Sequence, residues 1–153
     1  MKRVEVRLNL DAVAPLLDVM KDAGDELGAR LASPAEVPAA DDELAEPWRA
    51  ELLAGQTSDL GVLLGLFGAD FFAHGVIALD AANAEAVLRA SAALRLRLRE
   101  TRLRGLEDES LEAGEIDVDE LPEAQRRAFA AYIFLATLQE VVIQHLDPTA
   151  QES

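Results

Sequence analysis

The chain has 153 residues and a formal net charge of −15, and it contains no cysteine. This length suits one domain spanning residues 1–153, which at this size folds without a covalent or metal staple. The lack of cysteine excludes disulfides, thiolate metal sites and a cysteine nucleophile. The strongly negative charge disfavours binding to nucleic acid or to an anionic membrane.

Half of the residues are apolar, whereas aromatic residues make up 5%. This composition is typical of a helical core built from aliphatic side chains rather than of a β-sandwich. Charged residues occupy four of the first seven positions, and no long apolar stretch follows them, so the start does not resemble a signal peptide. We therefore expect a cytoplasmic protein.

The N-terminal part of the chain predicts a strand followed by a helix. Apolar residues alternate with charged ones from Val4 to Leu8, and this period of two is typical of a half-buried strand. Asp11 is a helix-capping residue, and the apolar spacing after it predicts a helix from about Asp11 to Leu31. Pro15 lies near the first turn, where proline is best tolerated.

A loop and a second helix come next. Residues 33–42 contain two prolines among small and acidic residues and predict the loop. The second helix is expected to begin near Glu43 or Pro47 and to end at Gly55. Its larger apolar side chains are expected to face inward: Trp48, Leu52 and Leu53.

A third helix is predicted from Thr57 or Ser58 to His74, with Gly75 in the usual glycine stop position. The apolar run from Val76 to Leu79 then predicts a second strand. Two such short strands are expected to pair as a ribbon that leans on the helices, because an isolated ribbon is marginal.

A long helix is predicted from about Ala81 to Gly105 and a last one from Asp119 or Pro122 to Leu146. Between them lies an acidic loop, residues 107–120, in which eight of fourteen residues are Asp or Glu. The tail, residues 148–153, is expected to fray. The fold class is therefore mainly α, a bundle of four to five helices with a two-stranded β ribbon.

The run from Leu60 to Leu79 is the most apolar of the chain and approaches the length of a membrane span. Asp70 and His74 interrupt it and Gly75 breaks its helix, so we expect a core helix followed by a strand. Small residues line the same helix and favour a close helix–helix contact, within one chain or between two: Gly61, Gly65 and Gly68.

Asp70 and His74 are four residues apart and therefore share one face of a helix. One interpretation is a histidine base oriented by a carboxylate. The other is a histidine at a helix C-terminus, favoured by the helix dipole, as also for His145. No nucleophile-bearing turn or glycine-rich phosphate loop accompanies the pair, so the second interpretation is preferred.

The stretch LRLRLRETRLR, residues 94–104, places arginines between leucine stripes on a predicted helix. Such guanidinium groups require partners, since an unpaired buried charge costs several kcal/mol. The candidate partners are Glu100, Glu140, Asp70 and the acidic loop. Three interpretations follow: ion pairs within the chain, a surface for another protein or a second copy, and a phosphate or nucleic-acid site. The arginines concerned are Arg95, Arg97, Arg99 and Arg102.

Apolar residues cover most of the last predicted helix, which indicates a central helix. Glu140 interrupts this surface and is expected to meet an arginine of the preceding helix. Alternatively, the excess apolar surface marks a dimer face.

Three segments together resemble an uncharacterised family of small bacterial, actinobacterial-type proteins described as a domain of unknown function. They are VRLNLDAVAPLLDVM, ALRLRLRETRL and AYIFLATLQEVVIQHL. The resemblance implies a gene neighbourhood shared with the protease adaptor ClpS, and hence a role in protein quality control. It implies no catalytic residues.

The preferred hypothesis is a non-catalytic interaction module that forms a homodimer, with no cofactor, metal, nucleic acid or membrane as partner. An enzyme with a site at Asp70 and His74 is the first alternative. A carrier of small apolar ligands is the second, since the leucine-rich core permits an aliphatic cavity.

Overall fold

The computed structural model describes residues 3–32, 43–106 and 118–146. The predicted loop at 33–42, most of the acidic loop and the C-terminal tail lie outside these residues. The described elements, in chain order, are β1 (Arg3–Arg7), α1 (Leu10–Glu26), α2 (Ala45–Gly65), α3 (Ala69–His74), β2 (Val76–Asp80), α4 (Ala84–Glu100), the 3₁₀ turn η2 (Val118–Glu120) and α6 (Glu123–Leu146). The predicted fold class, mainly helical with a small ribbon, is confirmed.

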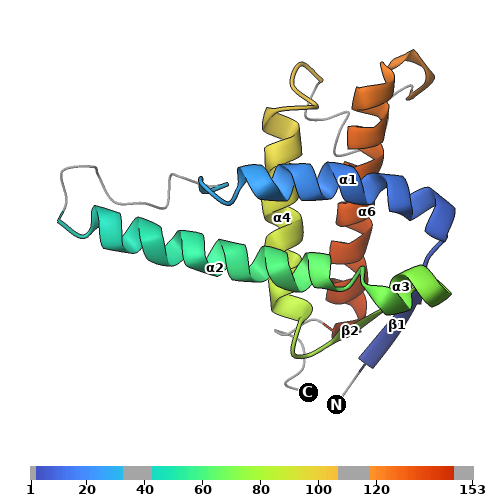
Figure 1. Cartoon of the computed structure of the whole chain (residues 1–153), viewed down its shortest axis with the longest axis horizontal. Helices are drawn as coiled ribbons and strands as arrows, with labels where there is room; N and C mark the ends of the chain where they lie inside the picture. The colour runs from blue at the N-terminus through green and yellow to red at the C-terminus, as the bar shows by residue number, and fades with distance from the viewer. Residues whose placement is uncertain (1–2, 33–42, 107–117, 147–153) are drawn as a thin grey trace.

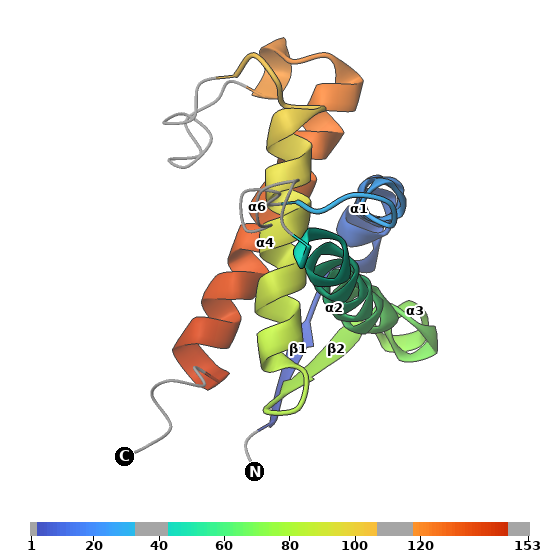
Figure 2. The same cartoon turned by 90° about the vertical axis from the view of Figure 1, so that its left-hand side faces the viewer.

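Two antiparallel helix pairs, stacked as two crossed layers, form the body of the molecule (Figure 1). One layer consists of α1 and α2, and the other, which runs across it, consists of α4 and α6 (Figure 2). The central helix is α4, because it packs against α6, α2 and α1. Its inward stripe includes Val87, Leu94 and Leu98, each with 0% of its surface exposed.

The last helix, α6, lies on the side of α4 away from α2 (Figure 2). A buried stripe that includes Tyr132, Leu135 and Val142 packs it against α4 and α1. The opposite face is exposed and carries Thr137 and Glu140. The expectation of a central helix is therefore wrong, because this apolar helix still keeps one polar stripe that faces water.

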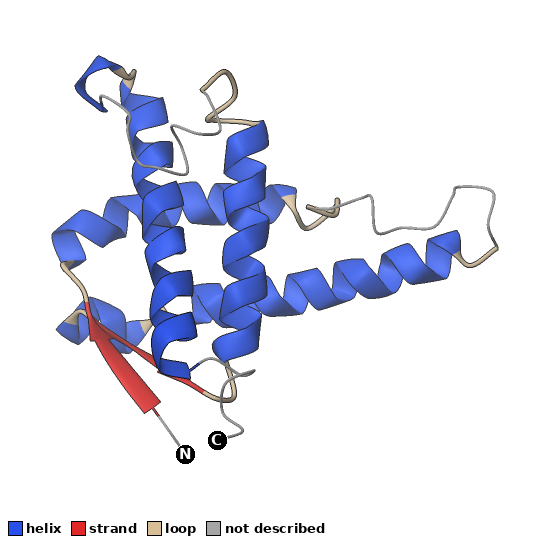
Figure 3. Cartoon of the chain, turned by 180° about the vertical axis from the view of Figure 1, so that it is seen from behind, coloured by secondary structure: helices blue, strands red, loops and turns tan. Residues whose placement is uncertain are grey.

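The two strands form the predicted antiparallel ribbon, drawn in red in Figure 3. The register pairs Val4 with Leu79 and Val6 with Ile77. These side chains join the hydrophobic core, whereas the charged residues between the valines are exposed. The helices therefore provide the support that an isolated two-stranded sheet lacks.

Gly75 ends α3, as its stop position predicted, and joins that helix to the ribbon. Its φ of +68° is left-handed, and its N–H donates to the carbonyl of Phe71 at 2.7 Å. Its own carbonyl accepts the N–H of Leu8 at 2.7 Å. A Cβ at this position would lie 2.9 Å from the Leu8 carbonyl oxygen, so both the dihedral angle and the close approach require glycine.

Helix α2 runs through Gly55 without a break, so the predicted helix end there and the separate start near Thr57 are wrong. A single glycine costs a helix only about 1 kcal/mol relative to alanine, which is too little to end one by itself. The chain leaves the helix at residues 66–68 instead. Trp48 was expected to face inward, but 48% of its surface is exposed.

Helices α1 and α4 are shorter than predicted. The α1 helix ends at Glu26, and the residues up to Leu31 form turns. The α4 helix begins at Ala84 because the side chain of Asp80 first accepts the N–H groups of Ala82 and Asn83. This Asx-type turn holds the chain between β2 and the helix.

Replacing Gly75 with alanine is expected to lower the free energy of unfolding by roughly 1–3 kcal/mol, because the side chain would be strained and would clash. Gly61→Ala is the matched control. A Cβ there meets nothing within 4 Å, so this variant is expected to gain roughly 0.5–1 kcal/mol from helix propensity. Urea unfolding followed by circular dichroism measures both. Equal stability of the Gly75 variant and the native chain would contradict the expectation.

Candidate functional site

The arginine-rich end of α4 meets the last turn of α1, where one carboxylate binds two guanidinium groups. Arg97 donates from Nε to Glu26 Oε1 at 2.8 Å. Arg102, just beyond α4, donates from Nη1 to Oε1 at 2.9 Å and from Nη2 to Oε2 at 2.7 Å. Since α1 crosses α4, these pairs clamp one layer of the fold to the other.

The two arginines lower the pKa of Glu26 from 4.5 to about 2. The hydrogen bond from Arg102 is the largest cause, and partial burial opposes it by favouring the neutral acid. The hydrogen bond from Arg97 and the charges of both guanidinium groups lower the pKa further. Glu26 is therefore an ionised structural anchor at neutral pH rather than a proton donor.

Arg95 lies between α4 and α6. Its guanidinium carbon is 4.5 Å from the centroid of the Tyr132 ring, and its Nη1 donates to Gln139 Oε1 at 2.9 Å. The amide of Gln139 donates in turn to the carbonyl of Leu88 at 3.2 Å. Gln139 thus takes the inward position expected for its neighbour Glu140, whose side chain is exposed.

Arg97 and Arg102 bind Glu26 of α1, which was not among the predicted partners. Asp70, Glu100 and Glu140 are exposed, and most of the predicted acidic loop lies outside the described residues. A signal for Glu26 was present: the last turn of α1 contains acidic residues and no basic one, although the helix dipole favours cations there. Arg99 is half-buried in the same part of α4. Ion pairing within the chain is therefore the interpretation that the structure favours for Arg97 and Arg102.

Asp70 and His74 lie on the six-residue helix α3, and both are exposed. They form no ion pair with each other within the described residues, and the groove outlined below contains neither. The spacing that places them on one helix face is present. Their exposure does not favour general-base catalysis, which needs a pocket that excludes water.

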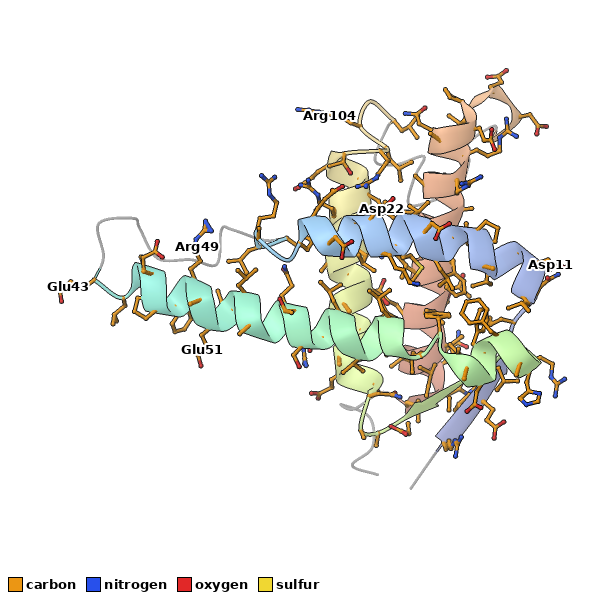
Figure 4. All side chains as sticks on the ribbon, viewed as in Figure 1. Asp11, Asp22, Glu43, Arg49, Glu51 and Arg104 are labelled. Atoms are coloured by element: carbon orange, nitrogen blue, oxygen red, sulfur yellow. The ribbon has the colours of Figure 1, made fainter. Side chains whose placement is uncertain are left out.

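The feature that the sequence did not reveal is a projecting arm. The first part of α2, residues 45–55, extends away from the crossed helices (Figure 1), with the labelled Arg49 on it and Glu43 just before it (Figure 4). Leu44, directly before it, is 65% exposed, and Trp48 is 48% exposed. We call residues 45–55 the arm.

A groove lies at the base of the arm, between α2, α4 and the residues that follow α1. Its volume is about 430 Å³, and one side is open to solvent. Its apolar walls come from all three segments, and a bidentate ion pair of Arg89 with Asp59, at 2.9 and 3.0 Å, closes one edge. The lining residues are Leu31, Ala32, Glu51, Leu52, Gly55, Gln56, Asp59, Arg89, Ala90, Ala92, Ala93 and Leu96.

The side chain of Gln56 joins α2 to the groove wall that is formed by the residues after α1. Its amide nitrogen donates to the carbonyls of Leu27 and Arg30 at 2.8 and 2.9 Å. Its amide oxygen accepts the N–H of Ala32 at 2.9 Å. One side chain therefore satisfies three backbone groups beyond the end of α1, which holds Leu31 and Ala32 against α2.

Within the described ranges, no group of three or more histidines or acids is arranged to hold a metal ion. The segment Ala45–His74 and α6 are each long and apolar enough to cross a membrane, by length and composition alone. The two differ in burial: 17% of the apolar window in Ala45–His74 is buried, against 39% of that in α6. The first segment, which is divided between α2 and α3, therefore has the smaller share of fully buried residues.

The Glu26 clamp predicts a dependence of stability on pH. Because the folded pKa lies below the unfolded value, its contribution is fully present above about pH 4.5 and is lost as the pH falls towards 2. Glu26→Gln is expected to lower the unfolding free energy at pH 7 by about 1–2 kcal/mol, a figure reduced for solvent screening of this partly exposed pair. The difference from the native chain should shrink below pH 4.5.

Urea unfolding at several pH values measures this difference. Glu100→Gln, an exposed position on α4, is the matched control and is expected to change stability by less than about 0.5 kcal/mol. A Glu26→Gln effect that persists undiminished at pH 2 would contradict the ion-pair origin.

The chain was compared with known families, curated proteins and solved structures. It matches the family described as Domain of unknown function (DUF2017) over residues 4–146. No curated protein matches it, and no solved structure does. The match runs from the first strand to the last residue of α6 and so includes the arm, the groove and the Glu26 clamp. The chain therefore belongs to this family of domains of unknown function.

Proposed function

We propose that this protein is a non-catalytic interaction module that associates with itself through the apolar face of α2. One observation carries the proposal: Trp48, on the projecting part of α2, is 48% exposed, and Leu44, directly before the helix, is 65% exposed. Large apolar side chains that are exposed close together are typical of a binding face.

The short length of the arm also supports self-association. Isolated helices shorter than about 12–15 residues are marginal in water, even with good helix formers. The arm is shorter than this and contains Gly55, a residue that disfavours a helix interior. A partner that packs along it would supply the tertiary contacts that normally stabilise a helix.

The energies are sufficient for a dimer. Burial of a large apolar side chain contributes about 1.5–3 kcal/mol, and Leu44, Trp48 and Leu52 would each be covered twice in a symmetric pair. Their sum, roughly 9–18 kcal/mol before discount for the surface that is already covered, compares with an association cost of about 4–15 kcal/mol. The expected dimer is therefore of moderate rather than extreme affinity.

The net charge of the chain makes some classes of partner less favourable than others. The net charge of −15 repels nucleic acid and anionic membranes, and it also repels a second copy. However, α2 carries only four charged residues in 21, one of them an arginine, so the proposed face itself adds little to this repulsion. Repulsion between the remaining surfaces is screened over about 8 Å at physiological salt.

A carrier of small apolar ligands is the second candidate, because the groove volume of about 430 Å³ falls in the range of small-molecule sites. It ranks below self-association because the groove is open along one side. An apolar fluorescent probe tests it: saturable binding that Ala93→Trp abolishes, with no change in oligomeric state, would favour the carrier.

The expected link to ClpS extends the proposal to protein quality control. It rests on the resemblance described above, and a pull-down with purified ClpS as bait tests it. An interaction that survives loss of the α2 face would place that partner on a different surface.

The chain is expected to sediment as a dimer, at twice its mass of 16.5 kDa, in the micromolar range. Trp48→Ala is expected to weaken the dimer at least roughly tenfold, since the change is made in both copies. Ile143→Ala, at a side chain 52% exposed on α6, is the matched control and should leave the mass unchanged. A native chain that stays monomeric at high micromolar concentration would refute the proposal.

Raising the salt concentration from about 0.05 to 0.5 M is expected to strengthen the dimer, because salt screens the repulsion between two acidic copies while the apolar contact persists. Sedimentation equilibrium at each salt concentration gives the dissociation constant. Weakening with salt would instead indicate an interface held by ion pairs.

A further inference from the structure

The ribbon has two outer edges, and its hydrogen-bond pattern shows which backbone groups lie on each. Leu8 donates its N–H to the carbonyl of Gly75 at 2.7 Å. Because such bonds alternate along an antiparallel pair, the register directs the backbone groups of Val4 and Val6 towards β2. The backbone groups on the free edge of β1 belong to three residues, which we call the outer residues: Arg3, Glu5 and Arg7.

The outer edge of β2 is already occupied by a side chain of the same chain. Asn83 donates from Nδ2 to the carbonyl of Ala78 at 3.1 Å, and its Oδ1 accepts the N–H of Asp80 at 3.0 Å. Both bonds lie on the side of β2 that faces away from β1, as the alternation requires. Asn83 thus engages backbone groups with which a further strand would pair, so strand addition at this edge is disfavoured.

The edge of β1 has no such cover among the residues that the structure describes. The main neighbour of β1 is β2, whereas β2 also packs against α3 and α6. The outer residues are exposed, and their backbone groups form no hydrogen bond with another described element. The side chains of Val4 and Val6 are only half-buried, although their partners on β2 are fully buried. The apolar face of the ribbon therefore extends beyond the part that the helices cover.

From this open edge we infer that β1 binds an extended segment of another protein, which adds to the ribbon as a third, antiparallel strand. A row of exposed N–H and C=O groups pairs best with the backbone of another strand. Aliphatic side chains at every second position of that strand would cover the half-buried valines of β1. The inference concerns a surface separate from α2 and does not depend on self-association.

The charges of the outer residues specify the chemistry of that segment. They alternate in sign along one face of the ribbon, and side chains directly opposite each other on neighbouring strands interact. A matching strand therefore carries an acid, a base and an acid at alternate positions, with aliphatic residues between them.

The same charges disfavour a second copy of β1 as the added strand. The symmetric register that pairs all three outer residues places Glu5 opposite itself and Arg3 opposite Arg7, and like charges directly opposite each other are destabilising. A register shifted by one residue about the twofold axis places either Arg7 opposite Met1 or Arg3 opposite Asn9, so one arginine of each copy lacks a charged partner. A foreign segment with the complementary order matches all three.

Three capped peptides test the inference. The probe, Thr-Glu-Val-Lys-Val-Glu-Thr, has the matching order of charges, and Thr-Lys-Val-Glu-Val-Lys-Thr is the control with the charges inverted. The net charge of −15 attracts the inverted peptide and repels the probe, so the charge of the whole chain predicts the opposite preference. The third peptide is the probe methylated on the backbone nitrogen of its lysine, which removes one donor that would face β1.

Amide hydrogen exchange of the isotope-labelled whole chain, followed by NMR, reads this edge residue by residue. In the free protein, the N–H groups of Glu5 and Arg7 are expected to exchange faster than that of Val6, which faces β2. The N–H of Asp80, held by Asn83, is the internal control. Millimolar probe is expected to slow exchange at Glu5 and Arg7 at least about fivefold and to leave Val6 and Asp80 unchanged.

Peptide titrations give the preference between the probe and the control. The probe is expected to bind at least about tenfold more tightly than the inverted peptide, because three favourable cross-strand pairs replace three unfavourable ones. A chain with Arg3→Glu, Glu5→Lys and Arg7→Glu is expected to reverse this preference. All three changes are at exposed positions, and circular dichroism verifies that the variant keeps its fold.

Slower exchange at the outer residues with the probe, together with a reversed preference in the charge-reversed chain, supports the inference. Unchanged exchange at millimolar probe overturns it, and so does a methylated probe that binds as tightly as the unmethylated one. A preference that the charge reversal leaves unaltered also overturns it. Slow exchange at Glu5 and Arg7 without any peptide overturns it as well. Such protection assigns the edge to a second copy if it grows with protein concentration, and to the chain itself if it does not.

Discussion

The described long helices each bury an apolar stripe, and α4 provides the surface against which α1, α2 and α6 pack. It lies between the layers and offers one side to α6 and another to α2, with Leu94 and Leu98 fully buried between them. Because its leucines alternate with arginines, the same helix must also place cations near the core. The Glu26 clamp and the contact of Arg95 with Tyr132 solve that problem locally, so Arg95, Arg97 and Arg102 each have a structural contact within the chain.

Much of the fold followed from local pattern. The period of two in the first strand, the apolar run of the second, the stop at Gly75 and the start of α6 are set by sterics and hydrogen bonding within a few residues, and these predictions are confirmed. The helix end predicted at Gly55 was wrong because helix propensity is a weak local preference, and a long helix can continue through one unfavourable residue. The prediction for Trp48 was wrong for a different reason. Hydrophobicity indicates that burial of a side chain is favourable, but it does not indicate whether the residues that bury it belong to the same chain.

The candidate site was only partly predictable. Arg97 and Arg102 were identified as needing partners, but Glu26 lies more than seventy positions away, and only the crossing of α1 over α4 brings it close. The Asp70 and His74 pair shows the reverse case, in which correct spacing exists without a pocket around it. The arm and groove could not be foreseen at all, because they depend on where α2 leaves the body. Family membership leaves the role open, so the physical properties of α2 supply the argument for function.

The amide of Gln56 has a consequence beyond the three backbone groups that it satisfies. It ties the turn after α1 to the middle of α2, so the projecting helix is fastened to one wall of the groove. A substitution at this one side chain would therefore alter the position of α2 and the shape of the groove together, although the two walls come from segments that are separate in the sequence.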